Sequence, residues 1–229
     1  MGAYLITGAN RGIGLELVRQ AAETAEPVFA CVRNVTGATE LQLLAGKSGG
    51  RVRIIEMDVG REASIAAAAA QVQNEPIATL INNAGVMGTR RTPLQTDEDE
   101  FLDIMRTNVL GPMLVTKALL PNLRAATNAK VAVISSLMGS FSYETTSYIA
   151  YSTSKSAVNR VFNALARELS GDGIHVAILS PGWVRTDMGG PNATLSVEDS
   201  ARGLLHEIAR TDASLSGKFR DYTGGALTW

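Results

Sequence analysis

Short runs of aliphatic and β-branched residues alternate along the chain with longer segments in which apolar residues recur at helical spacing. The short runs predict β-strands at residues 3–7, 27–32, 51–57, 77–81, 130–135, 174–180 and 218–222. The longer segments predict α-helices at residues 12–24, 38–45, 62–74, 97–125, 150–170 and 197–210. Strands that alternate with helices are joined by right-handed crossovers, so this order predicts an α/β fold with a doubly wound, mostly parallel sheet.

The predicted helix 97–125 is apolar on more than one side. Its apolar residues are Phe101, Leu102, Ile104, Met105, Val109, Leu110, Met113, Leu114, Val115, Leu119, Leu120 and Leu123. A helix with several apolar sides has to bury more than the side that faces the sheet. Two interpretations stay open: packing inside a thick core, or an interface between the subunits of a homodimer or homotetramer.

Length and charge limit the classes of protein to consider. The chain has 229 residues and a formal net charge of −1, with no basic block, which disfavours nucleic acids and anionic membranes as partners. No linker divides the chain, so we expect residues 1–229 to form a single domain. No apolar run approaches about 18 residues and the chain enters a strand directly, so we expect a soluble, cytoplasmic protein without a signal peptide.

The cysteine and histidine residues give no sign of a metal site. Cys31 is the only cysteine and lies in the apolar run 28–32, which indicates a buried structural thiol. His175 and His206 are far apart and lack the spacing of metal ligands. We therefore expect no metal.

A glycine-rich turn, Thr7-Gly8-Ala9-Asn10-Arg11-Gly12-Ile13-Gly14, follows the first predicted strand and opens the first predicted helix. Glycines there allow the backbone to approach a pyrophosphate, and a helix N-terminus favours its negative charge. The spacing G-x-x-x-G-x-G differs from the common G-x-G-x-x-G fingerprint. Its place between strand and helix still favours phosphate binding over a merely structural turn.

The end of the second predicted strand bears on the choice between NADH and NADPH. It reads Val32-Arg33-Asn34 and has no carboxylate to bind the ribose 2′-hydroxyl of NADH. An arginine at this place accommodates a 2′-phosphate, and Arg11 could add a second positive charge. The alternative is that both arginines are simply exposed; together with the missing acid they favour NADPH.

Polar residues also follow the third and fourth predicted strands. Asp58 lies in Met57-Asp58-Val59, where it could bond the adenine edge or equally serve as a turn or capping residue. The sequence Asn82-Asn83-Ala84-Gly85 ends the fourth strand. Asn and Gly tolerate left-handed backbone, so a structural turn is the default interpretation, although ligands also bind at strand ends in such sheets.

Tyr151 and Lys155 stand four residues apart in predicted helix 150–170, so their side chains face the same way. A phenol that works near neutral pH needs its pKa lowered by about three units, or about 4 kcal/mol. A cation about 4 Å away, at an effective dielectric constant near 20, supplies about 4 kcal/mol. The pair can therefore tune its own proton, although such spacing alone is also typical of solvated helix residues.

Taken together, the motifs resemble those of the short-chain dehydrogenase/reductase family over essentially the whole chain. The matching residues are Thr7-Gly8-x-x-x-Gly12-Ile13-Gly14, Asn82-Asn83-Ala84-Gly85, Asn108, Ser136, Tyr151, Lys155 and Pro181-Gly182-x-x-x-Thr186. Their occurrence in this order and spacing is what makes the resemblance specific. The ending 217–222 with terminal Trp229 is similar to the C-factor-like carbonyl reductase branch. The resemblance implies a Rossmann-type sheet flanked by helices on both faces.

The resemblance also implies a catalytic tetrad. Tyr151 would protonate the carbonyl oxygen during reduction, and Lys155 would lower the pKa of Tyr151 and bond the nicotinamide ribose. Ser136 would donate to the substrate oxygen; it is preferred to Ser135 because Ser136-x-x-Gly139 fits the family pattern. Asn108 would hold a water that links Lys155 to solvent. These roles agree with the needs of hydride transfer, which leaves an alkoxide-like oxygen.

The cofactor implied is NADP, with NADPH preferred over NADH. Asn82 to Gly85 would border the adenosine and ribose, and Thr186 would bond the carboxamide. The expected cofactor contacts are Gly8, Asn10, Arg11, Gly12, Ile13, Gly14, Arg33, Asn34, Asp58, Val59, Asn83, Ala84, Gly85, Tyr151, Lys155, Pro181, Gly182, Val184 and Thr186.

Two segments depart from the family pattern. The spacer between Ser136 and Tyr151 is slightly long, and residues 141–148 are expected to form a modified rim beside the pocket. The segment after Thr186 is short, which predicts an open cleft without the helical lid of related enzymes. The predicted pocket walls are Met138, Tyr143, Trp183 and Met188, each of which could equally be ordinary packing.

The leading hypothesis is an NADPH-dependent reductase of small or medium apolar aldehydes, ketones or quinones. An alcohol or hydroxysteroid dehydrogenase remains open, because the sequence does not fix the direction of reaction. A 3-ketoacyl carrier-protein reductase would need a basic docking patch, and no convincing one is present. From another class, a non-catalytic NADP-binding signalling protein is retained because of the C-factor resemblance.

Overall fold

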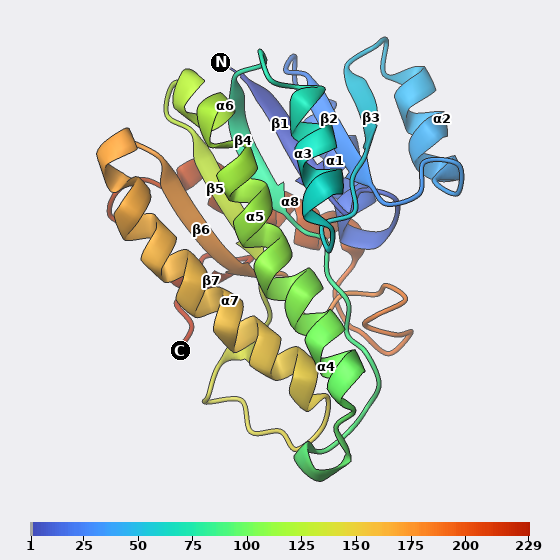
Figure 1. The fold of residues 1–229 in the computed structure, drawn as a ribbon, viewed down its shortest axis with the longest axis vertical. Coiled ribbons are helices and arrows are strands. Elements are labelled where there is room, and N and C mark those ends of the chain that lie inside the picture. The colour runs from blue at the N-terminus through green and yellow to red at the C-terminus, as the bar shows by residue number, and fades with distance from the viewer. Residues whose placement is uncertain (1) are drawn as a thin grey trace.

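The computed structural model describes residues 2–229 and contains one parallel sheet in the order β3-β2-β1-β4-β5-β6-β7 (Figure 1). Its strands are β1 (Ala3–Thr7), β2 (Val28–Val32), β3 (Val52–Glu56), β4 (Ile77–Asn82), β5 (Lys130–Ile134), β6 (His175–Ser180) and β7 (Phe219–Asp221). Each neighbouring pair is parallel, and each strand falls within one or two residues of its predicted position. The predicted Rossmann-type α/β class is confirmed.

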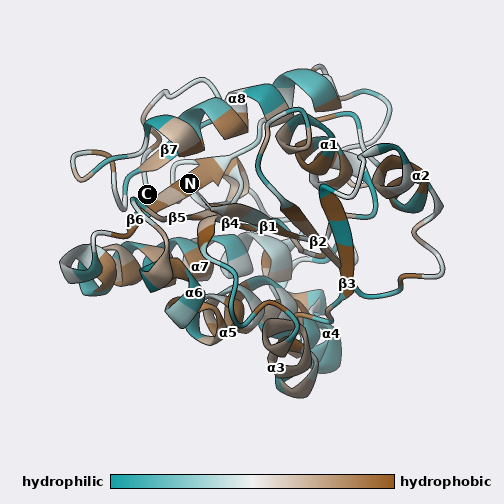
Figure 2. Cartoon of the chain, turned by 90° about the horizontal axis from the view of Figure 1, so that it is seen from above, coloured by the Kyte–Doolittle hydropathy of each residue, from teal (hydrophilic) through white to brown (hydrophobic). Residues whose placement is uncertain are grey.

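Helices cover both faces of the sheet (Figure 2). The α-helices are α1 (Gly12–Ala21), α2 (Thr39–Lys47), α3 (Glu62–Ala70), α4 (Glu98–Met105), α5 (Gly111–Ala118), α6 (Leu120–Ala125), α7 (Ile149–Glu168) and α8 (Val197–Arg210). Short 3₁₀ helices occupy Pro93–Gln95, Leu137–Gly139 and Leu169–Asp172. Helices α1, α2 and α8 pack on one face, and α3 to α7 pack on the other.

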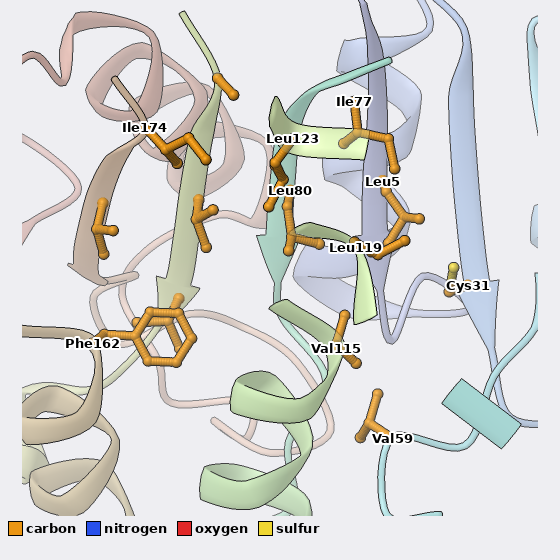
Figure 3. Packing of buried hydrophobic residues seen from close by; sticks show 14 of the residues in the cluster. Leu5, Cys31, Val59, Ile77, Leu80, Val115, Leu119, Leu123, Phe162 and Ile174 are labelled. Carbon is orange, nitrogen blue, oxygen red and sulfur yellow. The ribbon is translucent and has the colours of Figure 1, made fainter. Parts of the chain in front are cut away.

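Alternation along the strands divides the core into two layers. In β1, Leu5 enters the layer that contains Phe162 of α7, whereas Ile6 enters the layer that contains Leu17 of α1. Figure 3 shows part of the first layer, in which Leu5, Leu80 and Leu119 lie close together and Phe162 lies further along the same cluster. All of these side chains are almost completely buried, and each contributes about 1.5–3 kcal/mol of hydrophobic stabilisation. Helix α7 is thereby fixed against the sheet.

The prediction of one continuous helix over residues 97–125 is wrong. A five-residue π-helical turn, Arg106–Leu110, separates α4 from α5, and the chain breaks again at Leu119, where φ is −96° and ψ is 7°. Pro112 and Pro121 explain the breaks, because each lacks the N–H that a continuous α-helix requires. The turn places Asn108 inside the protein, where it is 1% exposed.

Five of the twelve apolar residues of this segment are buried in the core, five are half-buried and two are exposed. Ile104, Val109, Val115, Leu119 and Leu123 are buried, in agreement with the core-packing interpretation. Leu102 and Leu110 remain 52% and 47% exposed. They are the part of the segment that is available to a subunit interface, which stays a prediction.

The isolated cysteine is structural. Cys31 lies within β2 and is 1% exposed, as the sequence predicted. Burial raises the pKa of its thiol to about 12, so the reactive thiolate is suppressed. In the described part of the chain there is no group of three or more potential metal ligands. Among residues 2–229, no helix is both long and apolar enough to cross a membrane.

Candidate active site

A cavity of about 660 Å³ opens at the carboxyl edge of the sheet, where ligands bind in doubly wound folds. It is bordered by the starts of α1 and α7 and by the segments that follow β4, β5, β6 and β7. The predicted site residues that line it are Ile13, Ser136, Met138, Tyr143, Tyr151, Pro181, Gly182, Trp183, Val184, Thr186 and Met188. Residues from distant parts of the sequence are thus brought to one place.

The glycine-rich turn between β1 and α1 is packed too closely for side chains. Gly8 has φ of +66°, and a Cβ there would lie 2.8 Å from the Cα of Ala84. A Cβ at Gly14 would lie 2.1 Å from the carbonyl oxygen of Gly8. No side chain caps the N-terminus of α1, and its first turn contains no acid. The turn therefore suits an anionic group such as a pyrophosphate.

Thr7, which the sequence did not single out as a site residue, ties this turn to the end of β4. Its hydroxyl accepts hydrogen bonds from the backbone N–H groups of Asn83 and Ala84, both at 3.1 Å. The amide of Asn83 donates to the carbonyls of Thr7 and Gly8 at 3.0 and 3.2 Å. Asn82 is buried and donates to the hydroxyl of Thr116 at 3.3 Å. The side chain of Asn83 therefore holds the glycine-rich turn, whereas that of Asn82 ties the end of β4 to α5.

The two arginines proposed near a 2′-phosphate differ in their surroundings. Arg33 is exposed beyond the end of β2, and no ion pair engages it among residues 2–229. Arg11 donates to the carboxylate of Asp187 at 2.9 Å in an exposed pair. Its charge is thus already balanced, which the sequence did not predict. The side-chain oxygen of Asn34 accepts from the backbone of Gly37 at 3.1 Å.

Asp58 forms a turn after β3. Its carboxylate accepts from the backbone N–H of Gly60 at 2.9 Å, and its own N–H donates to the hydroxyl of Ser64 at 2.9 Å. The neighbouring Val59 is 8% exposed and packs against Gly111, where a Cβ would lie 2.8 Å from the Val59 carbonyl oxygen. The turn interpretation left open by the sequence accounts for these contacts; an adenine contact stays a prediction.

Tyr151 and Ser136 meet at the wall of the cavity. Tyr151 lies in the first turn of α7 and is 7% exposed, and Ser136 follows β5. Burial raises the pKa of the Tyr151 phenol, while a hydrogen bond with the Ser136 side chain opposes that rise. The expectation of a lowered phenol pKa is therefore wrong for this arrangement, because desolvation outweighs the favourable contacts. The phenol is protonated at neutral pH and can give up a proton.

The choice between the two neighbouring serines is supported by their surroundings. Ser135 is 2% exposed, and its hydroxyl donates to the side chain of Asn159 at 2.6 Å. Ser136 lines the cavity, and its hydroxyl accepts from the backbone N–H of Met138 at 3.1 Å. Only Ser136 of the two is therefore placed to contact a substrate.

Lys155 is buried one helical turn behind Tyr151. Its ammonium is 5.5 Å from the centroid of the Tyr151 ring and donates to the carbonyl of Ile134, at the end of β5, at 2.8 Å. A Cβ at Gly85 would lie 3.6 Å from this ammonium, so β4 also ends beside it. Burial lowers the pKa of Lys155 to about 8. A buried cation in this position stabilises any negatively charged group beside it.

Asn108 contacts the same region, but its side chain is fully used by the protein. The carboxamide oxygen accepts from the N–H of Val86 at 2.9 Å, and its nitrogen donates to the Val86 carbonyl and to the Ser154 hydroxyl at 2.8 and 2.9 Å. The expectation that Asn108 holds a water stays a prediction.

The loop after β6 forms one wall of the cavity. The Thr186 hydroxyl accepts from the N–H of Gly189 at 3.1 Å, and the Trp183 indole donates to the Gly189 carbonyl at 2.8 Å. A Cβ at Gly12 would lie 3.3 Å from Thr186 Cγ2, so this loop approaches the glycine-rich turn. Asn10 is exposed at that turn. No helix occupies residues 187–196, in agreement with the predicted absence of a helical lid.

The rim contains expected and unexpected residues. Segment 141–148 contributes Tyr143, Thr145, Ser147 and Tyr148 to the lining, as the long spacer predicted. Tyr148 has φ of 53°, a left-handed conformation that is costly for a residue with a large side chain. The sequence reasoning missed the contributions of Met87, Arg90, Leu137, Ser180, Asp221, Tyr222 and Leu227. No local motif marks these residues, because only tertiary packing brings their segments to the cavity.

Known proteins resemble the chain in sequence and in structure. The family model described as "short chain dehydrogenase" matches residues 3–194. C-signal of Myxococcus xanthus is 40% identical over 162 residues, which are 70% of this chain and 98% of C-signal. The carbonyl reductase Sniffer of D. melanogaster superposes with a TM-score of 0.94 at 32% identity, covering 100% of both chains. An NADPH-bound carbonyl reductase from chicken fatty liver superposes with a TM-score of 0.93 at 32% identity, covering 100% of this chain and 99% of the chicken chain.

Lys155 gives the free energy of unfolding a pH dependence of definite sign. Its pKa is about 8 in the folded protein against the ordinary value of 10.5. Between these values the unfolded chain retains a proton that the folded chain has lost, so wild-type stability rises with pH. Lys155→Met removes this term. We expect its stability relative to the wild type to fall by about 2 kcal/mol between about pH 7 and about pH 9.5, measured by urea denaturation.

Lys117→Met is the matched control, because Lys117 is exposed on α5. The difference in unfolding free energy between Lys117→Met and the wild type should not vary over the same pH range. If the difference in unfolding free energy between Lys155→Met and the wild type is equally constant with pH, the Lys155 ammonium is not desolvated.

Proposed function

The chain belongs to the short-chain dehydrogenase/reductase family, and from this premise we propose that it is an NADPH-dependent carbonyl reductase of small or medium apolar aldehydes, ketones or quinones. The observation that carries the proposal is the meeting of Tyr151 and Ser136 at one cavity, with the Lys155 ammonium buried behind them. These groups supply a proton, a hydrogen bond and a positive charge, which are what the reduction of a carbonyl requires.

Ser136, Tyr151 and Lys155 would have different roles at the substrate oxygen. A bound nicotinamide would supply the hydride to the carbonyl carbon. Ser136 would donate a hydrogen bond to the oxygen as negative charge develops, and Tyr151 would transfer its phenolic proton to it. The buried charge of Lys155 would stabilise the phenolate that remains. Burial raises the pKa of Tyr151, so the phenol begins the reaction protonated, and the charge of Lys155 would offset the cost of forming the phenolate.

The surroundings of the glycine-rich turn support a dinucleotide as cofactor, and those of β2 support NADPH. The uncapped N-terminus of α1 can bind the pyrophosphate. Arg33, rather than an acid, follows β2, and its guanidinium is free to pair with a 2′-phosphate. Arg11 already pairs with Asp187 in an exposed contact, so it would have to exchange that partner to bind the phosphate. The bound NADPH in the chicken carbonyl reductase agrees with this choice.

The cavity sets the substrate class. Its volume of about 660 Å³ is within the ordinary range for small ligands, and Met138, Trp183 and Met188 give it apolar walls. The absence of a helix from residues 187–196 supports an open entrance. Oxidation of alcohols at the same site remains an alternative, because the cofactor ratio sets the direction.

A signalling protein is the second candidate, and the similarity to C-signal is the observation in its favour. Such a protein would have no need of Tyr151, Ser136 and Lys155 together. Turnover of carbonyl compounds therefore separates the two candidates. Cytoplasmic location and assembly into a homodimer or homotetramer through residues 97–125 remain predictions.

The neighbouring serines provide a test of the reductase. We expect Ser136→Ala to lower kcat for carbonyl-dependent NADPH oxidation by roughly 10²-fold, because the oxygen loses a donor in a desolvated site. Ser135→Ala is the matched control: it removes a buried bond to Asn159, so it should lower stability by about 1–2 kcal/mol with little effect on kcat. Equal kcat for the two variants, or no turnover of any aldehyde, ketone or quinone by the wild type, would reject the proposal.

The cofactor preference has its own test. We expect Arg33→Asp to lower the ratio of kcat/KM for NADPH to that for NADH by roughly 10²-fold or more, because a carboxylate repels the 2′-phosphate and accepts from a 2′-hydroxyl. Arg202→Asp, on the exposed side of α8, makes the same change in net charge and should leave the ratio unaltered. An unchanged ratio in Arg33→Asp would exclude Arg33 from cofactor selection.

A further inference from the structure

Arg90 is a cation at the rim of the cavity that the proposed reduction does not use. It lies in the segment between β4 and α4, lines the cavity, and its Nε donates to the hydroxyl of Ser147 at 3.3 Å. Ser147 belongs to the opposite rim segment, which precedes α7. A backbone bond from Ile149 N–H to the Arg91 carbonyl, at 3.4 Å, joins the same two segments. The guanidinium thus contacts the opposite rim segment through Ser147, and a backbone bond holds the two segments together.

The terminal nitrogens of Arg90 are available. No carboxylate pairs with Arg90 within residues 2–229, whereas its neighbour Arg91 pairs with Glu100 at 3.3 Å. Because the Nε–H is held by Ser147, the two terminal NH₂ groups keep their donors for another acceptor. A planar fork held in this way matches the two oxygens of a carboxylate.

The cavity lining contains two charged residues of opposite sign. Arg90 is the only basic residue in the lining and Asp221 is the only acidic one. Oδ1 of Asp221 already accepts from the N–H and hydroxyl of Thr223 and from the N–H of Gly225, at 2.8, 2.7 and 2.9 Å. Asp221 is thus engaged by the turn after β7 and forms no ion pair with Arg90.

Aromatic side chains surround the rest of the space. Four of the five tyrosines of the chain, at positions 143, 148, 151 and 222, line this cavity, together with Trp183. Their flat faces favour a planar, conjugated ligand. Tyr151 marks the place of the reacting carbonyl, so an anionic substituent would lie at another part of the same ligand.

We propose that Arg90 selects substrates in which a carboxylate is attached to an aromatic carbonyl compound, and that it is a specificity-determining residue. This inference rests on the proposed function and narrows its substrate class from apolar carbonyl compounds to those that carry an anionic group. The carboxylate binds the guanidinium at the rim while the carbonyl reaches Tyr151 and Ser136.

Matched substrates test the proposal. Wild-type protein is assayed with NADPH and either 4-carboxybenzaldehyde or methyl 4-formylbenzoate, in which an ester replaces the charge. We expect kcat/KM to favour the carboxylate, and Arg90→Gln to lower the carboxylate-to-ester ratio by roughly 10- to 100-fold, the range of a charge-assisted hydrogen bond. Arg91→Gln is the matched control, because Arg91 does not line the cavity, and its ratio should stay within about twofold of the wild type.

A binding measurement separates this proposal from the proposed function. Calorimetric titration of wild-type and Arg90→Gln protein with 4-(hydroxymethyl)benzoate or benzyl alcohol requires no turnover. Tighter binding of the benzoate that is lost in Arg90→Gln supports the site even if no carbonyl compound is reduced. Equal affinity for the two alcohols in the wild type, or an equal loss of both in Arg90→Gln, overturns the role of Arg90 even if reduction is observed.

Discussion

The buried ammonium of Lys155 is the constraint around which the site is built. One hydrogen bond, to the carbonyl of Ile134 at 2.8 Å, holds it at the end of β5. Burying a charge with so few partners is costly, and the lowered pKa of about 8 expresses that cost. Any group that brings hydrogen-bond acceptors or negative charge beside this ammonium is therefore stabilised. A phenolate on Tyr151 and the hydroxyls of a ribose both meet that description.

The fold makes this arrangement rigid. Helix α7 is anchored by Val158 and Phe162, both completely buried, so the turn that carries Tyr151 and Lys155 cannot move without opening the core. The parallel sheet brings the ends of β1, β4, β5 and β6 to the same edge, where the glycine-rich turn, Gly85, Ser136 and Thr186 follow the strands. The residues proposed to bind the cofactor, to donate the proton and to contact the substrate are thus positioned by a single scaffold.

Sequence patterns were sufficient to predict the features that depend on residues close together in the chain. Strand positions follow from aliphatic runs, the tight turn between β1 and α1 from its glycines, and the shared face of Tyr151 and Lys155 from helical spacing. The failures depend on tertiary structure. Pro112 and Pro121 could have predicted the breaks in 97–125, but the inward position of Asn108 could not. The direction of the Tyr151 pKa shift, the pairing of Arg11 with Asp187 and the position of Arg90 depend on packing between segments far apart in the chain.

The central claim is that Tyr151 gives its proton to a carbonyl oxygen, and Tyr151→Phe tests it most directly. The ring is retained and only the hydroxyl is lost, so the core and the cofactor turn should remain intact. Carbonyl-dependent NADPH oxidation and the Kd for NADPH should be measured on the same preparation. We expect kcat to fall by roughly 10²- to 10⁴-fold while the Kd for NADPH changes by only a few fold. Turnover close to that of the wild type, with a carbonyl compound that the wild type reduces, would contradict it.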